Sequence, residues 1–239
     1  MWNGFETDEF EFEGFAASVV KPENKCGFAA LKTEYRDAFP ATEIMLLKNG
    51  FHIFYIQNKN RWGTSDDIER KARFIRFAAA KYGVSRRVVP VGMSCGGLFA
   101  IKLAAIHPEL VSCLYLDAPV VNYLSCPCGF GSGNILSGKT GDYTEILAAL
   151  ELSSISQLLS YREAPIDYLA RLADTRVPIA MVAGDSDKTV PYHENGALIE
   201  KIYKERTLEL FTSIKPGCDH HPHGLDDPTP VVEFILAHI

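Results

Sequence analysis

The chain has 239 residues, of which 47% are hydrophobic and 23% charged, so it is long and apolar enough to bury a sizeable core. This composition excludes intrinsic disorder. The 30 acidic and 24 basic side chains give a net charge of −6. The sequence has no run of Lys or Arg that could bind the phosphate backbone of a nucleic acid, so nucleic acid is not an expected partner.

Targeting and membrane signals are missing from the sequence. Residues 1–9 are acidic and lack the basic and apolar regions of a secretory signal. The most apolar stretch, 96–111, is interrupted by charged residues and proline before it reaches the roughly 18 residues of a membrane span. We therefore expect a cytoplasmic protein that keeps its six cysteines as free thiols and has no membrane partner.

The first half of the chain alternates short apolar runs with helical patterns. Residues 10–13 alternate Phe and Glu, as a strand at the edge of a sheet does. The elements expected after it are strands at 16–20 and 27–31, a helix at 40–48, a strand at 51–56 and a helix that Ser65 or Asp66 caps and that stops at Gly83.

The second half continues this alternation. The elements expected are a strand at 88–91, a helix at 96–107, strands at 112–117 and 178–183, a helix after Pro191, a strand at 208–214 and a helix from Thr229. Strands this apolar, separated by helices, are typical of parallel sheets. The sequence thus predicts an α/β fold with a mostly parallel central sheet and helices on both faces.

Residues 122–173 carry no strand signal. Long insertions without a sheet element often cover an active site, so we interpret this segment as a lid within one domain that spans residues 1–239. Its aromatic residues either line a substrate pocket or form a small core of their own, and we favour the second reading. These residues are Tyr123, Phe130, Tyr143 and Tyr161.

The strongest chemical signal is Gly92-Met93-Ser94-Cys95-Gly96-Gly97, directly between a strand and a helix. A sharp strand-to-helix turn strains the backbone at the serine and leaves no room for neighbouring side chains, which explains the glycines. The turn would place the Ser94 hydroxyl above the sheet, beside a helix N-terminus. The alternative is a glycine-rich turn with a capping serine, and we favour a catalytic nucleophile.

A carboxylate that would orient a catalytic histidine follows the strand at 178–183, at its carboxyl end. Asp187 is our choice. Asp185 is interpreted as a turn residue, as is Asp117 at the end of the strand at 112–117, although both remain candidates.

Three histidines follow the last strand. His220 is the favoured base, ahead of His221 and His223. A metal site is disfavoured, because His220 and His221 are adjacent and expected to point apart, and the pair Cys126 and Cys128 lacks a second pair to complete a coordination sphere. We expect no metal and no cofactor.

These segments together resemble the α/β-hydrolase superfamily. The resemblance rests on the segment 92–97, then Gly184-Asp185-Ser186-Asp187-Lys188-Thr189-Val190-Pro191, then Gly217-Cys218-Asp219-His220-His221. The order Ser, Asp, His along the chain is that of the superfamily. The sequence looks most similar to small bacterial esterase-like hydrolases, including prolyl-oligopeptidase-like members. The resemblance implies that Ser94 is the nucleophile, Asp187 the acid and His220 the base.

The chain departs from this resemblance at the oxyanion hole. Many esterases of this fold carry a His-Gly motif after the third strand, whereas the matching segment here, 30–35, has no glycine. Backbone N–H groups need no particular side chain, so Thr33 or Glu34 is expected to donate together with Cys95. Lys32 and Glu34 would place charges at the pocket mouth, or form an exposed salt bridge.

The function expected is hydrolysis of carboxylic esters, short-acyl or carbohydrate-linked, by a serine hydrolase through an acyl-enzyme. The partner expected is a small ester substrate. Two other classes stay open: a peptidase of the same fold, and a non-catalytic binding protein on this fold.

Overall fold

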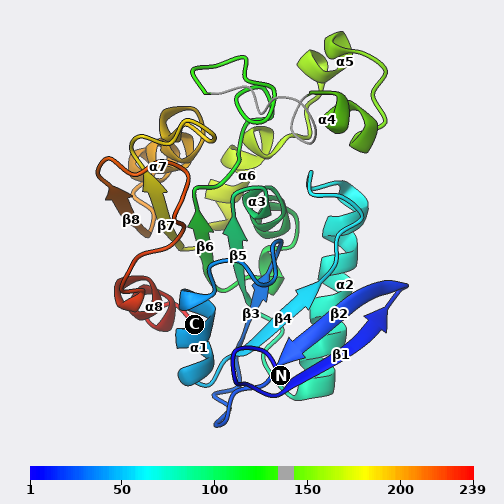
Figure 1. The fold of residues 1–239 in the computed structure, drawn as a ribbon, viewed down its shortest axis with the longest axis vertical. Coiled ribbons are helices and arrows are strands. Elements are labelled where there is room, and N and C mark those ends of the chain that lie inside the picture. The colour runs from blue at the N-terminus through cyan, green and yellow to red at the C-terminus, as the bar shows by residue number, and fades with distance from the viewer. Residues whose placement is uncertain (134–142) are drawn as a thin grey trace.

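The computed structural model describes residues 1–133 and 143–239, which form an eight-stranded sheet covered by helices on both faces (Figure 1). The strand order is β1-β2-β4-β3-β5-β6-β7-β8. The strands are β1 (Thr7–Phe12), β2 (Phe15–Val20), β3 (Ala29–Lys32), β4 (His52–Ile56), β5 (Val89–Met93), β6 (Leu114–Asp117), β7 (Ile179–Gly184) and β8 (Leu210–Lys215). Strands β3 to β8 run parallel, whereas β1 and β2 are antiparallel at one edge. The predicted mostly parallel α/β fold is therefore confirmed.

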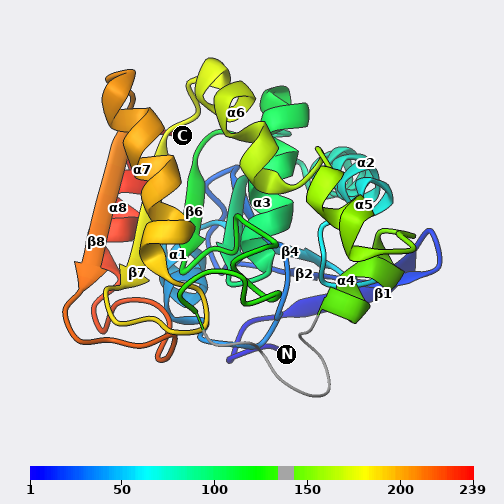
Figure 2. The same cartoon turned by 90° about the horizontal axis from the view of Figure 1, so that it is seen from above.

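Six of the eight described helices form two layers on the sheet. The eight helices are α1 (Ala41–Lys48), α2 (Ser65–Tyr82), α3 (Gly96–Ile106), α4 (Tyr143–Ala149), α5 (Ile155–Ser160), α6 (Leu169–Thr175), α7 (Gly196–Glu205) and α8 (Thr229–Leu236). Helices α1 and α8 pack on one face, while α2, α3, α6 and α7 share the other, where α6 lies against both α3 and α7 (Figure 2). None of the described helices is long and apolar enough to cross a membrane.

Alternation along each strand divides the core between these two layers. Leu114 and Leu116 of β6 belong to the core beneath α3, and Tyr115 between them belongs to the core beneath α1 and α8. All three side chains are buried. A strand whose successive side chains both meet a helical layer must be apolar throughout, which is the pattern that the sequence displayed.

Helix α2 follows its predicted limits with one difference. It ends at Gly83, whose φ of +66° suits the left-handed position after a helix. Its first residue is Ser65, and the N-cap is Thr64 rather than Ser65 or Asp66. Arg70 is buried, because its guanidinium binds Asp67 at 2.6 Å and covers the Phe15 ring at 3.5 Å.

The segment 122–173 has helices and no strand among its described residues; residues 134–142 lie outside them. Helices α4 and α5 lie beyond the carboxyl ends of β5 and β6 (Figure 1). The second part of the segment, with the 3₁₀ turn Pro165–Tyr168 and α6, packs on α3 and so helps to cover the sheet. That the segment acts as a lid stays a prediction.

Candidate active site

Ser94 occupies a strained turn between β5 and α3. Its φ is +50°, in the left-handed region that side chains other than glycine rarely adopt. The neighbouring glycines are needed for space: a Cβ on Gly97 would lie 2.6 Å from Pro119 Cβ, and one on Gly92 would lie 2.8 Å from Ala100 Cβ. This crowding explains why glycines flank the serine in so sharp a strand-to-helix turn, which is known as a nucleophile elbow.

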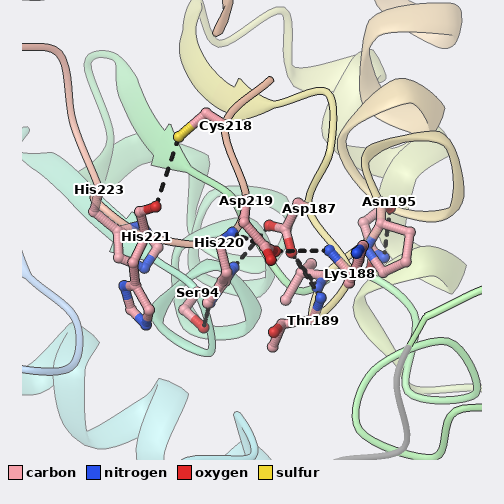
Figure 3. A network of polar contacts seen from close by, with 12 residues as sticks. Ser94, Asp187, Lys188, Thr189, Asn195, Cys218, Asp219, His220, His221 and His223 are labelled. Atoms are coloured by element: carbon pink, nitrogen blue, oxygen red, sulfur yellow. Dashed lines mark hydrogen bonds and ion pairs between the residues drawn. The ribbon is translucent and has the colours of Figure 1, made fainter. Parts of the chain in front are cut away.

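A chain of hydrogen bonds joins the three predicted catalytic side chains (Figure 3). Ser94 Oγ lies 3.0 Å from His220 Nε2, and His220 Nδ1 lies 2.7 Å from Asp187 Oδ2. The second Asp187 oxygen accepts the backbone N–H groups of Thr189 and Val190, at 2.8 and 2.7 Å. With the Nδ1 proton donated to the carboxylate, Nε2 is left as an acceptor for the serine proton.

Asp219, which the sequence analysis did not single out, ties the acid loop to the base loop. Its Oδ1 accepts the N–H of Lys188 at 2.9 Å and that of His220 at 2.8 Å. These two N–H groups lower the pKa of the Asp219 carboxyl, because they stabilise its charged form. One carboxylate thus sets the spacing between the loops that carry the acid and the base.

The two alternative acids lie elsewhere. Asp185 Oδ1 accepts the Gly217 N–H at 2.7 Å and the Ser186 hydroxyl at 2.9 Å, as a turn residue does. Asp117 is buried and faces His223, with its Oδ1 3.1 Å from Nδ1 of that ring. It is therefore more than the simple turn residue that we expected.

Of the three N–H groups expected to form the oxyanion hole, one is already used within the sheet and two are not. The Thr33 N–H is already donated to the Val91 carbonyl at 3.1 Å, as part of the pairing of β3 with β5. Within the described chain, the N–H groups of Glu34 and Cys95 have no hydrogen-bond partner. A Cβ on Gly96 would lie 3.6 Å from Glu34 N, so the two loops approach closely. Glu34 with Cys95 is the pair that we retain as a proposal.

Lys32 and Glu34, the two charged residues expected at the pocket mouth, each have a partner within the protein. Lys32 is buried and forms an ion pair with the equally buried Glu43, so the prediction for this lysine is wrong. Residue 32 alternates with its neighbours along β3 and therefore points to the face of the sheet that α1 covers. The Glu34 carboxylate accepts a hydrogen bond from the side-chain amide of Asn58.

A cavity of about 270 Å³ opens onto Ser94 and His220. Its other lining residues are Tyr35, Ala38, Phe39, Arg61, Trp62, Met93, Cys95, Cys126, Thr189, His221 and His223. None of the four aromatic residues of the predicted lid is among them; Tyr123 is buried with its ring 6.4 Å from that of Tyr161. The loop residues 35–39 and 61–62 carried no motif, and only the fold brings them to the serine.

The three histidines of the base loop cluster together, which contradicts the expectation that His220 and His221 point apart. The ring centroids of His220 and His221 lie 5.0 Å apart, and those of His220 and His223 lie 4.7 Å apart. His221 stacks on Phe39 at 5.6 Å. Partial desolvation against the neighbouring rings and the nearby imidazoles lower the pKa of His221.

Ser94 lies at a strand-to-helix turn, and the histidine and aspartate of its hydrogen-bond chain lie on the loops after β8 and β7. This is the arrangement of an α/β-hydrolase fold. Residues 52–235 match the model of the prolyl oligopeptidase family. The chain belongs to this family. No curated protein sequence matches it.

Solved structures share the fold at low sequence identity. An acylaminoacyl peptidase from Pyrococcus horikoshii superposes with a TM-score of 0.69 at 14% identity, over 91% of this chain and 38% of the peptidase. Dipeptidyl peptidase 4 from Porphyromonas gingivalis gives 0.71 at 14%, over 100% and 36%. A puromycin-hydrolyzing peptidase from Mycobacterium tuberculosis gives 0.69 at 12%, over 96% and 37%. The chain thus spans little more than a third of the length of these proteins.

Proposed function

We propose that the protein is a serine peptidase that cleaves small peptides or acylated amino-acid amides through Ser94, His220 and Asp187. The observation that carries the proposal is the hydrogen-bond chain from Ser94 Oγ through the His220 ring to Asp187, at 3.0 and 2.7 Å, on the wall of a cavity. Membership in the prolyl oligopeptidase family and the peptidase names of the similar structures support amide over ester substrates.

The geometry supports acyl transfer in two halves. Ser94 Oγ attacks the carbonyl carbon as His220 Nε2 takes its proton, and Asp187 stabilises the resulting imidazolium. The N–H groups of Cys95 and Glu34 would hold the oxyanion. His220 then gives the proton to the leaving amine, the C–N bond breaks, and the acyl group stays on Ser94. Water, deprotonated by His220, attacks this ester; the bond from the acyl carbon to Ser94 Oγ then breaks as His220 returns the proton to Oγ, which releases the acid and free Ser94.

Two buried donors at the cavity suit a substrate rich in carbonyl groups. Arg61 Nε and Trp62 Nε1 are buried and have no hydrogen-bond partner within the described chain. The Arg61 guanidinium lies 4.9 Å from the Trp62 ring centroid and binds Glu145 at 3.0 Å through Nη2. A buried donor without a partner costs about 1–3 kcal/mol, and a substrate carbonyl would recover this cost once a small side-chain movement opened these atoms to the cavity. A peptide offers such acceptors on both sides of its scissile bond.

The size of the cavity limits the substrate. About 270 Å³ is at the low end of the volumes of ligand pockets, so we propose substrates of one or two residues around the scissile bond. The same volume also fits short-acyl esters, and it is the specific observation that keeps a carboxylesterase as the second candidate function. Ester cleavage needs no protonated amine as leaving group, so a peptidase of this design would also hydrolyse activated esters.

The test compares amide and ester substrates with matched variants. Initial rates are measured for aminoacyl and N-acyl-aminoacyl p-nitroanilides and for p-nitrophenyl acetate and butyrate. Ser94→Ala is compared with Ser186→Ala, which removes an exposed hydroxyl from the neighbouring loop. Anilide hydrolysis that disappears only in Ser94→Ala supports the peptidase. Ester hydrolysis alone would favour the carboxylesterase. A chain that hydrolyses nothing and resists a fluorophosphonate label would be a non-catalytic binding protein.

A further inference from the structure

The triad explains only one of the three histidines that meet at the cavity. One ring nitrogen from each of His220, His221 and His223 lies within 4.8 Å of the other two. His220 and His223 are nearly buried, whereas His221 is exposed. A set of three imidazoles around one point is the donor set of many zinc sites, and the catalytic reaction requires only one of them.

Two of these rings are held as metal-binding histidines are held. Histidines that bind zinc usually donate their second ring N–H to a carboxylate, which fixes the ring and directs the other nitrogen at the metal. His220 Nδ1 lies 2.7 Å from Asp187, and His223 Nδ1 lies 3.1 Å from Asp117. Asp117 is fixed in turn, because its other oxygen accepts the Gly224 N–H at 2.6 Å. The Nε2 atom of each ring is thereby left with a lone pair, which in His220 faces the Ser94 hydroxyl at 3.0 Å.

The remaining ring is free to complete the set. His221 rests on the exposed ring of Phe39, and neither of its nitrogens has a hydrogen-bond partner in the part of the chain described. Tetrahedral zinc with Zn–N bonds near 2.0–2.1 Å requires nitrogens about 3.3 Å apart. The three ring nitrogens lie within 4.8 Å of one another, so a rotation of the exposed His221 side chain with small shifts of the two carboxylate-bound rings would bring them to this spacing. The carboxylates of Asp117 and Asp187 add negative charge behind the rings.

We propose that His220, His221 and His223 form a binding site for a divalent transition-metal ion, Zn²⁺ above all, and that the bound ion inhibits the hydrolase reversibly. The ion occupies the lone pair of His220 Nε2, which then accepts no proton from Ser94. Imidazole donors select Zn²⁺, Cu²⁺ and Ni²⁺ over Mg²⁺ and Ca²⁺, so the latter two ions would leave the enzyme active. Binding itself does not depend on the proposed function, whereas inhibition does.

Co²⁺ titration of the metal-free protein tests the site without any substrate. A Co²⁺ site built from imidazoles gives visible d–d absorption, and a thiolate ligand adds a charge-transfer band in the near ultraviolet. We expect one Co²⁺ per chain, no thiolate band, and a Kd at least about tenfold higher in His221→Gln. Two control variants should bind as the wild type does: Cys218→Ser, which removes the half-exposed thiol beside the cluster, and His193→Gln, which removes an exposed imidazole elsewhere.

Zn²⁺ inhibition is then measured for each variant relative to its own metal-free rate, with EDTA to reverse it. The Zn²⁺ concentration for half inhibition should rise in His221→Gln by the same factor as the Co²⁺ Kd. Unchanged Co²⁺ binding in His221→Gln, or binding lost in Cys218→Ser, would overturn the site. Co²⁺ binding at the histidines without Zn²⁺ inhibition of an active enzyme would overturn the inhibitory role. If no substrate is hydrolysed, the proposed function fails, while the Co²⁺ titration still decides whether the site exists.

Discussion

The left-handed backbone at Ser94 predicts that this position trades stability for activity. At a φ of +50°, a residue with a β-carbon costs about 1–2 kcal/mol relative to the usual right-handed backbone. Glycine avoids this cost, although it gives up roughly 0.5–1 kcal/mol of additional backbone entropy on folding. Ser94→Gly and Ser94→Ala both lose the hydrogen bond to His220, so that loss cancels between them. We expect Ser94→Gly to be more stable than Ser94→Ala by about 1 kcal/mol.

Thermal unfolding of the two variants measures this difference. For a chain of this size, 1 kcal/mol corresponds to about 2–4 °C in Tm. Ala80→Gly is the control, because Ala80 is exposed and lies in the last turn of α2, before the left-handed Gly83. There the same removal of a β-carbon should cost about 1 kcal/mol, with the opposite sign. A Ser94→Gly variant no more stable than Ser94→Ala would refute the argument from backbone strain.

Activity should be lost in both variants, whatever their relative stability. Neither variant retains the proposed nucleophile, so kcat should fall by at least about 10³ in both, whichever acyl substrate proves active. The assay is the initial rate on that substrate, with active-site labelling to exclude contamination by another hydrolase. A Ser94→Gly variant that gains stability and retains activity would exclude Ser94 as the nucleophile.

Three further predictions concern buried charges. Asp187→Asn should lower kcat by about 10⁴ without a change in circular dichroism, since the amide favours the wrong tautomer of His220; an unchanged kcat would exclude Asp187 as the acid. Lys32→Met should cost about 3–5 kcal/mol in urea unfolding, because Glu43 is left buried and unpaired, and the double variant with Glu43→Met should recover most of this loss. Burial lowers the pKa of Lys71 to about 8 from its model-peptide value of 10.5. The unfolded chain then binds more protons between these values, so wild-type stability relative to Lys71→Met should rise by about 3 kcal/mol from pH 7 to pH 11, and a difference independent of pH would contradict this.

Local patterns predicted most of the secondary structure, because each pattern reflects forces that act within a few residues. The left-handed stop at Gly83 and the apolar spacing of α2 depend only on backbone conformation and on one buried face. The Phe and Glu alternation at 10–13 corresponds to the edge strand β1, which is exposed on one side. The elbow at Ser94 was also readable, since its glycines are required by the sharpness of the turn itself.

Arrangements that depend on side-chain partners were predicted less well. Lys32 looked like a charge at the pocket mouth, and only the packing of α1 on β3 gives it Glu43 as a buried partner. The burial of Arg70 likewise depends on Phe15, whose ring on β2 lies 3.5 Å from the guanidinium. In both cases the covering residue lies on another element of the fold, so no local pattern encodes it.

Short-range sterics and strand periodicity dictate the parallel α/β fold and the strained turn at Ser94, so both could be predicted from the residues alone. Which groups meet at Ser94 depends instead on how the strands and loops assemble. The loops after β3, β4, β7 and β8 converge at the carboxyl edge of the sheet, and there Asp219 joins the acid and base loops while Asp117 holds His223. The same convergence gathers three imidazoles at one point, since a parallel sheet brings the ends of strands distant in sequence to one edge.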